Sequence, residues 1–225
     1  MKNKLKEIIE QFRVIGGGNF AVIDALLPSL VFIIAIRFLQ LATALLITLI
    51  PAGVLLLLRI FRKQSKLYIA IGAAGLIFAF GSAWISGNAA GYFLPSIVSD
   101  AFLSLFCLIS IFLKRPLVAL TSHITRRWPL AWYWHSKVRP AYSEVTLFWG
   151  LYFGLKIIPQ WFLYNNGNTQ TLGWLNILTG FPGLIILLMF SYLYGLWRLR
   201  NLRGPSVEEF IQHAIPPWKG QTSGF

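Results

Sequence analysis

Five ionisable residues lie in or beside long apolar stretches of the sequence: Asp24, Arg37, Asp100, Glu144 and Lys156. An ionisable side chain is costly inside a membrane-spanning helix, so such residues mark ion pairs, proton relays, substrate sites or headgroup contacts. The stretch LFWGLYFGLKIIPQWFLY, residues 147–164, poses this question most sharply, because it places Lys156 and Gln160 among neighbours suited to lipid. These charges are the best guide in the sequence to what the chain does.

The amino-acid composition is that of a membrane protein and not of a soluble domain. Of the 225 residues 56% are hydrophobic and 12% are charged, whereas a soluble domain carries about 25% charged residues. The net charge of +13 comes from short basic clusters between apolar segments, which argues against nucleic-acid binding. The single cysteine, Cys107, excludes an intramolecular disulfide and is expected to be a small core hydrophobe.

Segments of about 20 mostly apolar residues predict membrane-spanning helices. The chain is therefore expected to be an all-α polytopic membrane protein. The expected domains are an amphipathic N-terminal segment at 1–19, a transmembrane domain at 20–197 with an interfacial segment at 117–139, and a tail at 198–225. The six predicted spans are Phe20–Ile36, Leu39–Leu58, Leu67–Ile85, Tyr92–Leu113, Ala141–Tyr164 and Leu172–Trp197.

The basic residues predict the orientation of these spans. All but two of the 20 lysines and arginines fall at one side, and the exceptions are Arg37 and Lys156. The loops on the opposite side, SGNAAG and NNGNTQT, carry no charge. Because basic loops stay in the cytoplasm, both termini are expected to be cytoplasmic, with the protein in the bacterial inner membrane.

Two cytoplasmic pieces are expected to lie at the membrane surface. The N-terminal segment has one apolar face at helical spacing, followed by a glycine hinge at Gly16–Gly18. The segment 117–139 mixes tryptophans with basic residues, which is typical of contact with anionic lipid headgroups. The apolar face of the N-terminal segment consists of Leu5, Ile8, Ile9 and Phe12.

Depth along the helices suggests how the charges group. With a rise of about 1.5 Å per residue from Ala141, Lys156 lies about 22 Å into a core of about 30 Å. Asp100 and Arg37 are expected at a similar depth, so the three form an outer polar layer with Gln160 one turn beyond Lys156. This cluster would bind substrate or form an ion pair. Pro159 and Pro182 are expected to kink the fifth and sixth spans beside it.

Structural explanations compete with a transport role. Lys156 can extend its ammonium to the headgroups, or pair with Asp100 to fix helix packing. Asp24 and Glu144 lie near the inner boundary, where a carboxylate also complements the positive end of a helix. The cations within reach of these two carboxylates are Arg59, Lys66 and Arg139.

Two internal similarities suggest a repeat. DALLPSLVFIIAI (residues 24–36) is similar to DAFLSLFCLISI (residues 100–111) once the proline is skipped. The two would run in opposite directions, as in a three-plus-three inverted repeat of a transporter. A competing alignment pairs the hairpin ending in SGN with the one ending in NNGN.

Catalytic machinery is not visible in the sequence. His123, His135 and His213 lie outside the predicted spans, and the chain has no HExxH, GxSxG or P-loop pattern. No metal site and no cofactor are expected, and the chain is predicted not to be an enzyme.

Four motifs carry a family resemblance: DALLPSLVF, LKRPLV, LKIIPQWFLY and LGW. With them the chain resembles a family of uncharacterised bacterial inner-membrane proteins, known only as a domain of unknown function and abundant in actinobacteria. It is more distantly similar to the intracellular septation protein A family. The resemblance implies an arginine where this chain has Lys156, and a permanently charged residue favours ion pairing or headgroup binding over proton transfer.

Two main hypotheses of function follow. The chain is either a small transporter-like or lipid-interacting membrane protein, or an accessory or scaffold subunit of a larger membrane complex. A small lipid-modifying enzyme is a third hypothesis, disfavoured by the missing catalytic cluster. Anionic lipids are the expected partners, with a homo-oligomer or a larger complex as further alternatives.

Overall fold

The computed structural model consists of helices joined by short loops, and the part that it describes contains no strand. It describes residues 19–62 and 64–225, without the side chains of residues 19–25 and 68. Residues 1–18, with the predicted amphipathic face and glycine hinge, lie outside this description. The chain divides into two compact units. Unit 1 is the described part of Met1–Ser96 with Gln160–Pro182, and unit 2 is Ile97–Pro159 with Gly183–Phe225. The predicted all-α class is confirmed.

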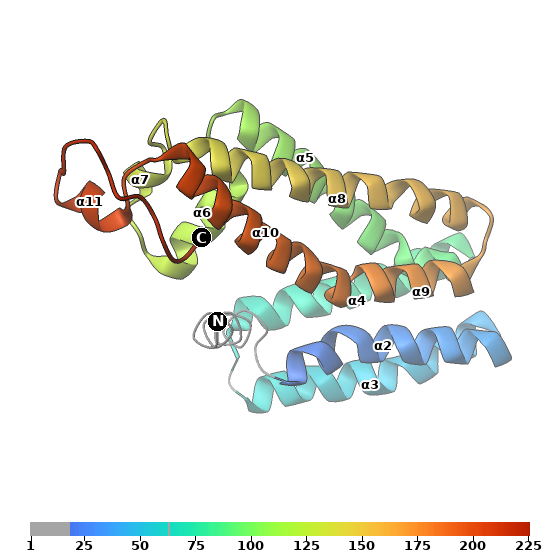
Figure 1. Ribbon diagram of the computed structural model, residues 1–225. Helices are drawn as coiled ribbons and strands as arrows, with labels where there is room; N and C mark the ends of the chain where they lie inside the picture. Colours follow the sequence, from blue (N-terminus) through green and yellow to red (C-terminus); the bar gives the residue numbers. More distant parts are fainter. Residues whose placement is uncertain (1–18, 63) are drawn as a thin grey trace. The chain divides into compact units, whose positions relative to one another are not determined.

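Unit 1 is built on the tight hairpin that the sequence predicts between its first two apolar segments (Figure 1). Helix α2 (Asn19–Phe38) is followed almost directly by α3 (Leu41–Phe61), and α4 (Lys66–Ser86), η1 (Ala89–Phe93) and α9 (Thr169–Thr179) complete the unit.

Aromatic packing and a close helix approach hold unit 1 together. The ring of Phe32 in α2 stacks on that of Tyr92 in η1, with 4.1 Å between the centroids. Gly173 allows α9 to approach α2 closely, because a Cβ there would lie 2.3 Å from Cδ1 of Ile33.

Unit 2 takes most of α5 (Leu94–Phe112), α8 (Arg139–Asn165) and α10 (Phe181–Leu202), together with α6 (Leu117–Arg126), α7 (Leu130–Tyr133) and α11 (Val207–Ile211). Its core includes the fully buried rings of Trp132, Tyr133 and Tyr142. Cys107 is also fully buried, which confirms its expected role as a small core residue.

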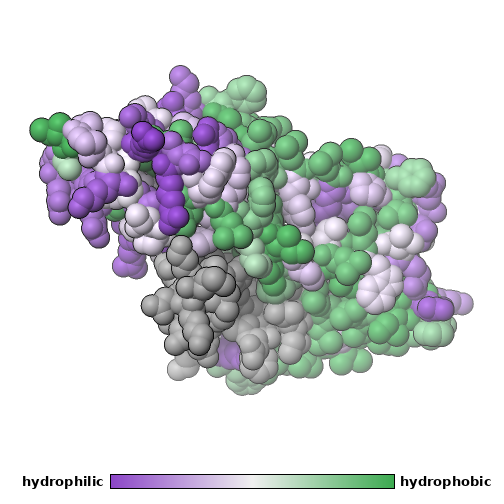
Figure 2. Space-filling view, viewed as in Figure 1, coloured by the Kyte–Doolittle hydropathy of each residue, from purple (hydrophilic) through white to green (hydrophobic). Residues whose placement is uncertain are grey.

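Four stretches of the described chain are long and apolar enough to cross a membrane: Leu41–Phe61, Ile69–Ser86, Ala89–Phe112 and Thr169–Leu202. Large hydrophobic side chains are exposed along them, such as Ile50 at 67% and Phe61 at 78%. Apolar surface of this extent favours a lipid environment over water. Figure 2 shows hydrophobic side chains over much of the helices and hydrophilic ones gathered at the end of unit 2 that carries α7 and α11.

The predicted count of six spans goes beyond these four. Helix α8 coincides with the predicted fifth span but is not among the four. The described apolar part of α2, Leu26–Phe38, is shorter than a span. Six spans, the inverted repeat and the cytoplasmic termini therefore stay predictions.

The predicted sixth segment is not one helix. It divides at Gly180 into α9 and α10. The predicted interfacial segment does not place all of its aromatic side chains at the surface. Trp132 and Tyr133 are fully buried within unit 2. The indole N–H of Trp132 donates a hydrogen bond to the carbonyl of Pro205 at 2.9 Å, so this tryptophan anchors the tail and not the headgroups.

Candidate functional site: buried polar clusters

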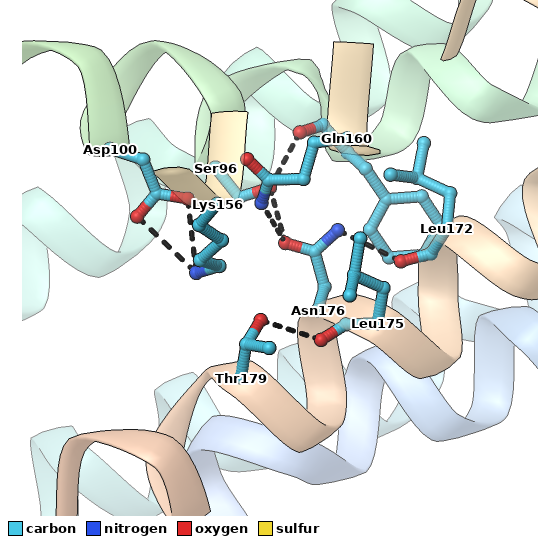
Figure 3. A network of polar contacts seen from close by, with 9 residues as sticks. Ser96, Asp100, Lys156, Gln160, Leu172, Leu175, Asn176 and Thr179 are labelled. Carbon is cyan, nitrogen blue, oxygen red and sulfur yellow. Dashed lines mark hydrogen bonds and ion pairs between the residues drawn. The ribbon is translucent and has the colours of Figure 1, made fainter. Parts of the chain in front are cut away.

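The structure brings together Asp100 and Lys156, two of the residues that the sequence places in an outer polar layer (Figure 3). In unit 2, the Nζ of Lys156 lies 3.0 Å from Oδ2 of Asp100 and 3.3 Å from Oδ1. The side chains of the lysine and the aspartate are only 9% and 7% exposed. This pair is a buried ion pair in which each charge offsets the other.

Close packing of two helices positions this pair. Gly150 of α8 faces α5 so closely that a Cβ there would lie 3.2 Å from Cβ of Cys107. The hydroxyl of Ser104 in α5 donates a hydrogen bond to the carbonyl of Gly150 at 2.9 Å. Small residues at such crossings let two helix backbones approach, and here the approach brings the lysine of α8 to the carboxylate of α5.

A second polar cluster lies in unit 1 around the side chain of Asn176 (Figure 3). Its Oδ1 accepts hydrogen bonds from Nε2 of Gln160 at 2.9 Å and from the hydroxyl of Ser96 at 2.8 Å. Its Nδ2 donates to the carbonyl of Leu172 at 2.9 Å. Gln160 is fully buried, so this amide network replaces the water that these groups would otherwise need.

The polar residues of α5 and those of α8 are each spaced about one helical turn apart. Ser96 and Asp100 are four residues apart in α5, and Lys156 and Gln160 are four residues apart in α8. Residues at this spacing share one face of a helix. Each helix thus carries a polar pair on a single face among apolar residues.

A helix break follows Asn176 in the chain, between α9 and α10. Gly180 separates α9 from α10 with φ −78° and ψ −114°, and a Cβ there would lie 2.6 Å from the carbonyl oxygen of Asn176. Pro182, the second residue of α10, has no N–H to donate, which costs nothing in the first turn of a helix. The predicted kink at Pro182 is therefore a full break, placed two residues earlier.

Two further predicted charges, Arg37 of the outer layer and Asp24 near the inner boundary, lie in α2. Arg37 is an exposed residue in the last turn of α2, in unit 1, and its guanidinium lies 5.9 Å from the ring centroid of Phe38. Its membership in a cluster with Asp100 and Lys156 stays a prediction. Asp24 lies in α2, and its side chain is outside the described part.

Glu144 has partners that the sequence did not suggest. Its carboxylate accepts three hydrogen bonds from the guanidinium of Arg198 in α10, the shortest at 2.8 Å. The hydroxyl of Tyr194 donates a further one at 2.9 Å. Arg198 is not one of the cations, Arg59, Lys66 and Arg139, that the sequence placed within reach of Asp24 and Glu144. The helices α8 and α10 place Glu144 and Arg198 together within unit 2.

The three cations that the sequence placed within reach of Asp24 and Glu144 are Arg59, Lys66 and Arg139. In unit 1, Arg59 of α3 lies across α4, where a Cβ on Gly72 would be 2.3 Å from one of its guanidinium nitrogens. Lys66 is exposed as the first residue of α4, and Arg139 is half-buried as the first residue of α8.

Sequence reasoning missed Ser96, Asn176 and Arg198. The signal for Asn176 was present, since it is an amide within the apolar run LGWLNIL. Arg198 was counted as one of many basic residues after the last span, and only helix packing selects it. Among the described residues, no group of three or more His, Cys, Asp or Glu side chains is placed to hold a metal ion.

Comparison with known proteins gives one match. Residues 16–199 match the family described as Protein of unknown function (DUF3159). No curated protein and no solved structure matched the chain. The matched range includes both polar clusters, three of the four stretches that are long enough to span a membrane, and the fourth as far as residue 199. This chain is therefore an all-helical member of the DUF3159 family with the features of a membrane protein.

Proposed function

We propose that this chain is a non-enzymatic integral protein of the bacterial inner membrane with a small transporter-like role. In this role, polar side chains inside the helical units interact with a small ion. The proposed polar groups are the Asp100–Lys156 pair in unit 2 and, separately, the side chains of Gln160, Asn176 and Ser96 in unit 1.

The helix break at Gly180 carries this proposal. In unit 1 it interrupts the apolar stretch Thr169–Leu202 one turn after Asn176, whose side chain is bonded to Gln160 and Ser96. Irregular backbone inside a membrane is tolerated only where protein or a water-filled cavity surrounds it. Broken helices beside buried polar groups are also the usual construction of solute sites in transporters.

The loops of unit 1 support the proposed orientation. Asn88 lies against Gly167, where an added Cβ would be 3.8 Å from its side-chain nitrogen. The two uncharged loops are therefore neighbours, as expected if both face away from the cytoplasm. Arg59, Arg62 and Lys66 lie at the opposite end of α4 from the first of these loops. Both termini are accordingly proposed to be cytoplasmic.

A second candidate function is that of an accessory or scaffold subunit, as a homo-oligomer or in a larger membrane complex. The enclosure of the Asp100–Lys156 pair favours it, because both side chains are under 10% exposed and an ion pair closed to solvent serves equally well to fix helix packing.

Ion flux through proteoliposomes tests the first proposal. Vesicles holding a dye sensitive to the ion under test receive the full chain, and imposed gradients of H⁺, Na⁺, K⁺ and Cl⁻ are each followed over time. We expect faster dissipation of at least one gradient than in empty vesicles, and slower dissipation with Ser96→Ala or the charge-neutral Asp100→Asn/Lys156→Met. Arg198→Met is the control, since it removes a cation outside the proposed site.

Two outcomes would contradict the transport proposal. Wild-type vesicles that match empty vesicles for every gradient would overturn it. Flux that is unchanged in both site variants would show that the ions pass elsewhere. Stable copurification of the chain with other membrane proteins, lost in Asp100→Asn/Lys156→Met, would instead support the scaffold function.

A further inference from the structure

The end of unit 2 forms a folded lobe outside the long helices, made of residues 114–138 and 203–225. Its tail is fixed in place by Trp132, which donates to the carbonyl of Pro205 at 2.9 Å. It is also fixed by Glu209, whose carboxylate accepts hydrogen bonds from the backbone N–H of Lys219 at 2.7 Å and of Gly220 at 3.2 Å. Side chains on this lobe therefore have defined neighbours.

Three exposed cations of the lobe lie on three separate segments of the chain: Lys137, Arg203 and Lys219. Lys137 packs against Gly204, where a Cβ would lie 3.0 Å from the lysine carbonyl oxygen. A Cβ on Gly220 would in turn lie 3.4 Å from the carbonyl oxygen of Gly204. The chain thus brings the segments of all three cations together around Gly204.

The charge of this cluster is not offset by carboxylates. Within the described part of the chain, none of the three cations forms an ion pair with an acidic side chain. The nearby Glu209 has its oxygens occupied by backbone N–H groups. In unit 2, Asp100 and Glu144 are paired with Lys156 and Arg198. Glu208 and Glu209 are the acidic side chains of the lobe, against seven lysines and arginines in residues 114–138 and 203–225, so the lobe as a whole is positively charged.

The cluster lies where a helix that can span the bilayer ends. Arg203 directly follows α10, the last helix of the apolar stretch that ends at Leu202. Lys137 lies two residues before α8. Beside them are amphipathic and apolar groups: Nζ of Lys137 lies 5.3 Å from the ring centroid of Trp218, and Ile215 in the same tail is 86% exposed. Tryptophan and cations together are typical of the headgroup level of a membrane.

We propose that Lys137, Arg203 and Lys219 form a docking site for the phosphate of an anionic phospholipid in the bilayer that α10 enters. The cations bind the headgroup, and Trp218 and Ile215 lie against the upper part of the acyl chains. This inference concerns the lobe and is independent of the transport site proposed above.

Lipid binding to the purified full chain tests the inference. The chain is kept in detergent at 0.15 M salt and titrated with phosphatidylglycerol or phosphatidylcholine of identical acyl chains, and bound lipid is counted by native mass spectrometry. A cation near an anionic surface contributes about 1 kcal/mol, or roughly fivefold in affinity. We expect wild type to prefer phosphatidylglycerol, and Lys137→Gln/Arg203→Gln/Lys219→Gln to lose at least tenfold of that affinity with phosphatidylcholine unchanged.

A second triple variant matches the first in charge. Lys114→Gln/Arg115→Gln/Arg127→Gln removes three exposed cations of the same lobe that lie outside the cluster, and its affinity is expected to fall less than threefold. An equal loss in the two triple variants, or no preference in wild type, would overturn the site.

Two competitors separate a lipid from other phosphates. If glycerol 3-phosphate or a short DNA duplex displaces phosphatidylglycerol at equal concentration, the cluster is a general phosphate or nucleic-acid site, and lipid docking is wrong. The flux assay is scored on the same triple variants. Lost lipid preference with unchanged flux in Lys137→Gln/Arg203→Gln/Lys219→Gln would support lipid docking and leave the transport proposal standing. A wild-type chain that prefers phosphatidylglycerol but dissipates no gradient would leave lipid docking standing and overturn transport.

Discussion

Two ion pairs in unit 2 join helices by the same chemistry in different surroundings. Asp100–Lys156 links α5 to α8 with side chains that are 7% and 9% exposed. Glu144–Arg198 links α8 to α10 with side chains that are 31% and 32% exposed. Solvent screens an exposed pair, whereas a buried charge without its partner carries a full desolvation cost. Exposure, and not distance, therefore decides how much each pair matters.

The largest expected effect comes from removing one charge of the buried pair. Lys156→Met leaves Asp100 buried without its cation, which is expected to cost about 3–5 kcal/mol in the free energy of unfolding. Chemical denaturation in detergent measures it. The matched Asp100→Asn/Lys156→Met is expected to regain most of the loss, because no charge remains. A loss below about 1 kcal/mol in Lys156→Met would mean that Asp100 reaches solvent.

A smaller effect is expected from separating the helices that hold the buried pair. Gly150→Leu inserts a side chain where even a Cβ would lie 3.2 Å from Cβ of the buried Cys107. Overpacking of this kind costs about 1–3 kcal/mol. Gly75→Leu in α4 is the control, since a Cβ on Gly75 has nothing within 4 Å. Equal unfolding free energies for the two variants would contradict close packing of α5 on α8.

The half-buried pair Glu144–Arg198 is expected to contribute less. Arg198→Met removes the bidentate partner of Glu144, and we expect a cost of about 1 kcal/mol or less, which shrinks further in 1 M salt. Denaturation at low and high salt checks this expectation. A loss as large as that of Lys156→Met would show that exposure does not separate the two pairs.

Glu209 adds a carboxylate held by backbone N–H groups and not by a cation. Hydrogen bonds from the backbone of Ser206, Lys219 and Gly220 lower the pKa of Glu209 from its ordinary 4.5 to about 2. Because the pKa is lower in the folded state, the stabilisation is complete above about pH 4.5 and is lost as the pH falls towards 2.

Hydrogen exchange of residues 206–221 measures this effect on the tail. We expect protection in this segment to fall between pH 4.5 and 2 after correction for the intrinsic exchange rate. Glu209→Gln, which keeps the shape of the side chain, should give lower protection that does not change over this range. Protection in wild type that is constant between these pH values would contradict the bound carboxylate.

The sequence predicted the features that depend on local pattern. The helical segments and the hairpin of α2 and α3 follow from apolar runs and a short gap, and the matching depths of Asp100 and Lys156 follow from helical rise. The partner of Glu144 did not follow, because several cations lie within reach and only packing of α8 on α10 selects Arg198. The position of the break was also missed, since Pro182 is the stronger sequence signal although Gly180 carries the backbone change.

The burial of Trp132 could not be predicted for a related reason. Tryptophans beside arginines have the same composition at a membrane surface and in a small core. The difference lies in the carbonyl of Pro205, which is 73 residues away in the chain.

A double-mutant cycle tests the central claim most directly, namely that the buried Asp100–Lys156 pair is the stronger polar link in unit 2. Unfolding free energies are measured for Asp100→Asn, Lys156→Met and their combination, and for Glu144→Gln, Arg198→Met and theirs. We expect a coupling energy of about 2–3 kcal/mol for the buried pair and below about 1 kcal/mol for the half-buried pair. Equal coupling energies, or a larger value for Glu144–Arg198, would contradict the account.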